Sequence, residues 1–323
     1  MSYYQLLESD VHSRGMKVII QSQVEPAGNG FSSGDPLGLA TYYASFPDFA
    51  SYVNGRAANT LAIAQLAPDF LNFSPEPDTE GLKAAQSAAA MALTANRTNP
   101  SFAANVRQLQ TTILSAFENA RLAGLHTKLK LAVGMGSWEY QLNTILKNEL
   151  SLAGVDIIDI HVHAINTIAG NDFLMNVLAI ANAAKAAGKQ PGMDEDWEYK
   201  ERDDELGSSG SISDAEIEAR DHWSFWAPID QAFIQDMVNT SYYEGMAYFE
   251  ASAPSHFFAY LDYGNTGGCN TTTTAAHPPS SVCSPTQWDN AENQAVDRDL
   301  AHSPAALTST GSFYAGIIRS SPR

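Results

Sequence analysis

Short apolar segments alternate with helical patterns along this chain, and that alternation constrains the fold more than any other feature. Six such segments are apolar on both faces: residues 15–26, 69–74, 128–139, 155–166, 190–198 and 245–253. Strands buried on both faces are typical of a parallel sheet that helices cover on both sides. The sequence therefore predicts an α/β protein, and both an open doubly wound sheet and a closed barrel fit the pattern.

Helical patterns fill the intervals between the predicted strands. The clearest is 99–124, which places Phe102, Val106 and Ile113 on one stripe, starts near Pro100 and ends at Gly124. Further helices are expected at 46–67, 141–154, 173–188, in the region up to about residue 240, and at 305–319. No strand is followed by GxGxxG or GxxxxGK[ST]. The main sequence signal of a nucleotide-binding doubly wound sheet is therefore missing, which disfavours that type of fold.

Charge and hydropathy limit the classes of partner. The chain has 323 residues, with 18 basic against 36 acidic residues and a formal net charge of −18. A phosphate backbone is repelled by such a field, so nucleic acid is not an expected partner, whereas a neutral sugar is not penalised. No apolar run reaches the length of a membrane span, and the amino terminus lacks the pattern of a signal peptide.

The only two cysteines, Cys269 and Cys283, lie in a polar loop at 264–287. A disulfide that closes this loop is favoured over two free thiols, and two cysteines alone form no metal motif. The pair favours export. A secreted or periplasmic location is therefore expected, although a cytoplasmic one stays open.

Polar side chains replace Val and Ile at the carboxyl ends of three predicted strands. Alternate strand residues share a face, which groups Asn72, Ser74 and Glu76, then Asp159, His161 and His163, and finally Glu195 with Trp197. Barrel enzymes take their catalytic residues from these strand ends. Two carboxylates there suit glycoside cleavage, in which a retaining enzyme holds them ~5–5.5 Å apart. The alternative is that Glu76 and Glu195 are solvated loop acids among the 36 of this chain.

Three motifs in this order, DFLNFSPEP, VDIIDIHVHAIN and QPGMDEDWEYK, resemble clan A of the retaining glycoside hydrolases. The resemblance covers nearly all the chain and implies one catalytic (β/α)8 domain over residues 1–323, with six recognisable strand–helix units. It further implies that Glu76 is the acid/base after the fourth strand and that Glu195 is the nucleophile after the seventh. The implied substrate is a β-linked oligo- or polysaccharide, with no metal and no organic cofactor.

The sequence departs from this clan in three places. Pro75 stands where the clan has an Asn that binds the sugar 2-hydroxyl, and His163 stands where it often has a Tyr that hydrogen-bonds the nucleophile. The first two strands of the barrel have no counterpart after Met1. We therefore expect a barrel without these strands, a barrel closed in another way, or an assignment displaced by two strands.

Other residues carry both a functional and a structural interpretation. His161, His163, Trp138 and Trp197 are candidates for binding the sugar, although packing explains the two tryptophans equally well. Glu25 and Glu250 are the alternative carboxylates. Two other functions stay open: a carbohydrate-binding barrel without catalysis, and a metal-dependent hydrolase that uses His161 and His163.

Overall fold

The computed structural model describes residues 3–22, 49–75, 100–123, 128–137, 144–164, 173–198, 226–251, 257 and 307–321. Six strands in this part of the chain form one sheet: β1 (Ile19–Gln21), β2 (Phe70–Asn72), β3 (Lys130–Gly136), β4 (Ile157–Ala164), β5 (Gln190–Glu198) and β6 (Phe249–Ala251). They are neighbours in the order of the chain, from β1 to β6. The pairs β1–β2, β2–β3 and β3–β4 are parallel.

This strand order decides between the two predicted architectures. A doubly wound sheet starts from its middle and reverses direction at a switch point, which gives a shuffled order of strands. A (β/α) barrel adds each strand beside the previous one, as this sheet does. The fold is therefore of the (β/α)-barrel type, and the predicted fold class is confirmed.

Seven helices of 7 to 23 residues accompany these strands in the described ranges: α1 (Tyr3–Ser13), α3 (Phe49–Ala64), α7 (Pro100–Leu122), α8 (Thr144–Leu150), α9 (Phe173–Ala186), α11 (Trp226–Glu244) and α14 (Ser309–Ser320). Apart from α1, each lies in a range where the sequence pattern predicts a helix. None of them combines the length and the apolar character that a membrane-spanning helix requires.

The chain divides into two compact units. Unit 1 comprises Met1–His161, Asp172–Met193 and Glu244–Tyr248, and unit 2 comprises Val162–Asn171, Asp194–Tyr243 and Phe249–Arg323. The strands β4 and β5 each contribute residues to both units. The prediction of one catalytic domain over residues 1–323 stays a prediction.

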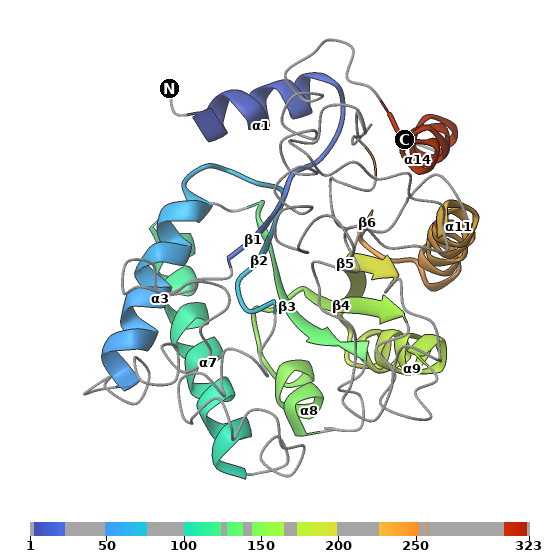
Figure 1. The fold of residues 1–323 in the computed structure, drawn as a ribbon. Coiled ribbons are helices and arrows are strands. Elements are labelled where there is room, and N and C mark those ends of the chain that lie inside the picture. The colour runs from blue at the N-terminus through green and yellow to red at the C-terminus, as the bar shows by residue number, and fades with distance from the viewer. Residues whose placement is uncertain are drawn as a thin grey trace, which may run out of the picture. The chain divides into compact units, whose positions relative to one another are not determined.

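Unit 1 has a dense apolar core around the central strands. Leu71 of β2, Leu131 of β3 and Ile158 of β4 are fully buried. Outside the strands, α3 and α7 lie side by side (Figure 1). The predicted stripe of α7 is confirmed for Val106 and Ile113, which have no exposed surface. Burial of such side chains stabilises the fold by about 1.5–3 kcal/mol each.

Unit 2 has its own core, in which α14 is fixed by its amino end. The Thr308 hydroxyl accepts a hydrogen bond from Gly311 N at 2.9 Å, and Thr308 N donates to the Phe257 carbonyl at 2.9 Å. Tyr314 of α14 packs its ring edge-on against Phe249 of β6, with 6.2 Å between the ring centroids. These contacts attach β6 to α14.

A close backbone approach in unit 1 requires glycine in β3. Gly134 N donates to Ser74 O at 2.8 Å, and a Cβ at residue 134 would lie 2.8 Å from the carbonyl carbon of Pro75. No real Cβ tolerates that separation from backbone. Only glycine therefore lets the segment that ends at Pro75 lie against β3.

We predict that Gly134→Ala lowers the free energy of unfolding by about 1–3 kcal/mol, because the new methyl group displaces the backbone at Pro75. The matched control is Gly55→Ala in α3, where a Cβ meets nothing within 4 Å. That substitution should stabilise by roughly 0.5–1 kcal/mol, the usual gain of Ala over Gly within a helix. Urea unfolding of both variants measures the difference, and equal stabilities would contradict the close approach.

Candidate functional site

A buried amide–carboxylate contact links two strands of unit 1. Asn72 Nδ2 of β2 donates to Asp159 Oδ2 of β4 at 2.7 Å, and His161 Nε2 lies 3.4 Å from the same oxygen. All three side chains are fully buried. They were predicted to share the carboxyl ends of their strands, and the structure brings them together.

The strand register explains how Asn72 reaches Asp159 across β3. Asn72 pairs with Ala132, and Asp159 pairs with Gly134. Paired and alternate residues point to the same face of a sheet, so the contact passes over the small residues Ala132 and Gly134 of β3. The backbone of Pro75 approaches Gly134 on that same face. The polar contact therefore lies beside the segment that leads directly to Glu76.

The polar cluster continues onto two helices. Asn72 Oδ1 accepts from Ser74 N at 3.3 Å, and Gln110 Nε2 of α7 donates to Ser74 Oγ at 3.3 Å and to Glu149 Oε1 of α8 at 2.9 Å. Gln110 and Glu149 were not predicted from the sequence, yet both are fully buried. The available signal was a polar residue beside the apolar stripe of α7, at a position that faces the core.

Asp159 and His161 are the members of this cluster that a metal-dependent hydrolase would use as ligands. Asp159 offers a carboxylate oxygen and His161 offers an imidazole nitrogen. Among the described residues, no group forms a hydrogen bond with Asp159 Oδ1. The two histidines of the predicted HxH metal pair have different neighbours. His161 lies beside Asp159, whereas the His163 ring contacts Trp197.

Unit 2 contains a strained backbone at the predicted nucleophile. Glu195 has φ 55° within β5, and Ala67 with φ 70° is the only other described non-glycine residue with positive φ. Ala67 lies in the turn after α3, where a left-handed residue is common. Inside a strand the same conformation costs about 1–2 kcal/mol for a residue with a Cβ. Strain of this kind clusters at functional sites.

A hydrogen bond involves Glu195 itself, and an aromatic contact involves Trp197, close to it in β5. Glu195 N donates to Glu250 Oε2 of β6 at 3.4 Å. Two positions further along β5, the Trp197 ring meets the His163 ring edge-on, with 5.1 Å between centroids and an interplanar angle of 70°. The structure therefore brings together Trp197 and His163, both predicted to bind substrate.

Tyr314 supplies a neutral hydroxyl in unit 2. Burial raises the pKa of Tyr314 to about 12, a backbone hydrogen bond with Ala251 opposes the rise, and the charges of Glu250 and Asp196 add to it. The phenol therefore stays protonated throughout the physiological range. Asp196 is buried, whereas Glu250 is exposed.

Several predicted residues lie outside the described residues. They are the acid/base candidate Glu76, the sugar-binding candidate Trp138, the alternative carboxylate Glu25, and the loop with Cys269 and Cys283. The convergence of Glu76 and Glu195 therefore stays a prediction, as does the disulfide.

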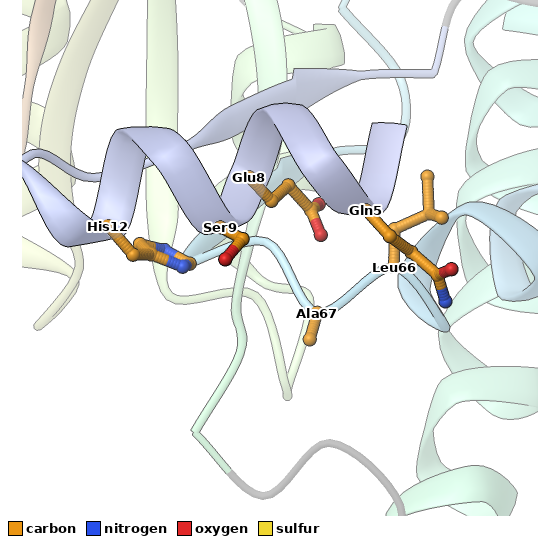
Figure 2. Close-up of a pocket in the computed structure, with 6 residues that line it drawn as sticks. All are labelled: Gln5, Glu8, Ser9, His12, Leu66 and Ala67. Carbon is orange, nitrogen blue, oxygen red and sulfur yellow. The ribbon is translucent and has the colours of Figure 1, made fainter. Parts of the chain in front are cut away.

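A separate hollow of about 590 Å³ lies in unit 1 between α1 and the turn after α3 (Figure 2). Glu8 and His12 line it from α1. Burial raises the pKa of Glu8, and this effect outweighs the lowering by His12. The hollow adjoins the amino end of β2, where Asp69 accepts hydrogen bonds from His12 Nε2 at 2.9 Å and from Val18 N at 2.8 Å. Conserved chemistry in barrels lies at the opposite strand ends, so we assign this hollow a role in stability.

Comparison with known proteins finds similarity among solved structures but not among sequences. No protein-family model matches the sequence, and no curated protein matches it. Among solved structures, the chain is similar to a GH53 catalytic domain from Ignisphaera aggregans, with 15% identity over 77% of this chain and a TM-score of 0.44. The match spans 66% of that domain, just under two thirds of its length. A similarity at this level assigns no activity and no residue role.

We predict that the contribution of Asp69 to stability disappears in acid. Burial raises its pKa, but the hydrogen bonds from Val18 N and His12 and the charges of His12 and Lys17 lower it further, so the folded-state pKa is below the ordinary value. The stabilisation is therefore complete above the unfolded pKa and is lost as the pH falls through the folded one. Asp69→Asn should cost about 1 kcal/mol at neutral pH, and this difference from wild type should shrink below about pH 4.

Asp10→Asn is the control, because Asp10 of α1 forms an exposed ion pair with Arg14, the residue that follows this helix. Its removal should cost no more than about 0.5 kcal/mol. The measurement is urea unfolding at several pH values. A constant difference between wild type and Asp69→Asn across the acid range would contradict the assignment.

Proposed function

We propose that this protein is a retaining glycoside hydrolase that cleaves a β-linked oligo- or polysaccharide. Glu195 is the nucleophile and Glu76 is the acid/base. The observation that carries the proposal is the left-handed backbone of Glu195 in the carboxyl-terminal half of β5, a strand of a barrel-type sheet. Strained non-glycine residues and the carboxyl ends of barrel strands are both places where catalytic side chains concentrate.

The mechanism follows from two carboxylates with different tasks. Glu76 gives its proton to the oxygen of the leaving sugar while Glu195 attacks the anomeric carbon and forms a glycosyl-enzyme. Glu76 then takes a proton from water, which releases the sugar from Glu195 with the original configuration restored. Two carboxylates ~5–5.5 Å apart shift each other's pKa values in opposite directions, which keeps one of them protonated.

Aromatic side chains beside the nucleophile suit a sugar substrate. Trp197 presents an indole that packs in a T-shaped arrangement with the His163 ring. Sugar rings stack on the faces of such aromatic side chains. His161 has no exposed surface. We therefore assign it a supporting role beside Asp159 in place of the direct sugar contact that the sequence suggested.

The charge and the cysteines complete the proposal. A net charge of −18 favours a neutral substrate over an anionic one. The two cysteines of the 264–287 loop favour a secreted or periplasmic location. We propose that no metal takes part in the chemistry.

We predict that Glu195→Gln lowers kcat on an aryl β-glycoside at least about 10³-fold, because the amide cannot attack the anomeric carbon. Glu76→Gln should lower it about 10²–10⁴-fold on substrates with a poor leaving group. The loss should be smaller on nitrophenyl glycosides, whose leaving group needs no proton, and added azide should restore turnover. The assay is product release across a panel of aryl β-glycosides.

The matched control for these variants is Glu118→Gln, an exposed acid on α7. It should retain wild-type turnover. Wild-type-like activity in Glu195→Gln or in Glu76→Gln would remove that residue from the mechanism. Tight binding of an oligosaccharide without any hydrolysis would favour the carbohydrate-binding alternative.

A metal-dependent hydrolase is the second candidate, favoured by the buried Asp159–His161 pair and by Asp159 Oδ1, which accepts no hydrogen bond from the described residues. We predict that hydrolysis of the glycoside persists after EDTA treatment and dialysis. Metal analysis of the purified protein accompanies the assay. Stoichiometric zinc, with activity that is lost to EDTA and restored by zinc, would replace the glycosidase proposal with this one.

A further inference from the structure

Glu250 lies on β6 and contacts the backbone of the proposed nucleophile. Its Oε2 accepts a hydrogen bond from Glu195 N at 3.4 Å, and both residues belong to unit 2. We propose that Glu250 is a positioning residue, whose carboxylate holds the left-handed backbone of Glu195 and thereby aims the nucleophile. This inference rests on the proposed function of Glu195, but the contact itself can be tested without any activity.

The backbone conformation at Glu195 needs an external support. In the left-handed region the Cβ of an L-residue crowds the following carbonyl oxygen, and glycine alone escapes this cost. Such conformations persist only where the surroundings fix them. The φ of 55° also changes the direction of the Cα–Cβ bond relative to a regular strand. The backbone angle therefore decides where the carboxylate of Glu195 points.

A carboxylate is a suitable acceptor for this purpose. Hydrogen bonds to an ionised acceptor are about twice as strong as those between neutral groups. Glu250 also comes from an anchored strand: Phe249 before it packs against Tyr314, and Ala251 after it shares a backbone hydrogen bond with Tyr314. The support therefore passes from α14 through β6 to the backbone of Glu195.

The same geometry distinguishes Glu250 from a second nucleophile. Glu250 is exposed and directs an oxygen at a backbone N–H, whereas Glu195 is partly buried in the strained strand. A nucleophile cannot be replaced by an amide without loss of the reaction. A positioning residue can be, because Gln retains an oxygen acceptor at the same reach. The two roles therefore predict opposite results for Glu250→Gln.

The first experiment compares steady-state kinetics of Glu250→Gln, Glu250→Leu and the control Asp236→Ala, which removes an exposed charge from α11. We expect Glu250→Leu to lower kcat about 10- to 100-fold with KM within about twofold, because misplacement of a reacting group costs turnover. Glu250→Gln should stay within about threefold of wild type, and Asp236→Ala should match it. Loss of turnover in Glu250→Gln as complete as in Glu195→Gln would overturn the proposal and make Glu250 catalytic.

The second experiment measures amide hydrogen exchange at Glu195 and needs no substrate. Glu250→Leu should accelerate exchange of this amide severalfold, whereas Glu250→Gln and Asp236→Ala should not. Unchanged exchange in Glu250→Leu would overturn the positioning role. If Glu250→Leu fails to fold, Glu250→Asp serves in both experiments, because it keeps the charge but shortens the reach by one methylene. An inactive wild type with the expected exchange pattern would reject the glycosidase proposal alone and leave the contact established.

Discussion

The hydrogen bond between Asn72, the last residue of β2, and Asp159, inside β4, is the constraint on which the polar cluster of unit 1 depends. It joins β2 to β4 over the intervening strand, at 2.7 Å and without solvent contact. The bond exists only because β3 has Ala132 and Gly134 beneath it. Gly134 in turn admits the backbone of Pro75. One small residue thus serves both the polar contact and the path of the chain toward Glu76.

The sequence predicted the succession of strands and helices correctly, because each strand of a covered parallel sheet is buried on both faces and therefore has an apolar sequence. It overestimated strand length: β1, β2 and β6 have three residues each, against predicted segments of six to twelve. Apolar character extends past the point where pairing stops, since residues such as Phe73 are buried without belonging to a strand. The apolar pattern of a sequence indicates which residues are buried. It does not indicate which residues form backbone hydrogen bonds with a neighbouring strand.

The site was predictable in composition but not in conformation. Alternation placed Asn72 and Asp159 at strand ends, and the structure joins them. The left-handed backbone of Glu195 had no such signal, because a local preference would have placed glycine there. Gln110 and Glu149 were missed for a related reason: they bond to each other between two helices, which single-helix periodicity cannot record. Partners distant in sequence decide both features.

The buried polar cluster of unit 1 is better explained by position than by stability. Replacing a buried polar set with apolar residues of similar size is often neutral or stabilising, because desolvation offsets much of what the contacts contribute. A hydrogen-bonded set does, however, require one relative placement of its members, whereas an apolar core tolerates several. The end of β2 is held in this way, because hydrogen bonds join Ser74 to Asn72 and to Gln110. Glu76 follows Ser74 by two residues. A fixed position for the end of β2 is useful to Glu76 only if its carboxylate must reach a defined partner, as an acid/base must reach its substrate.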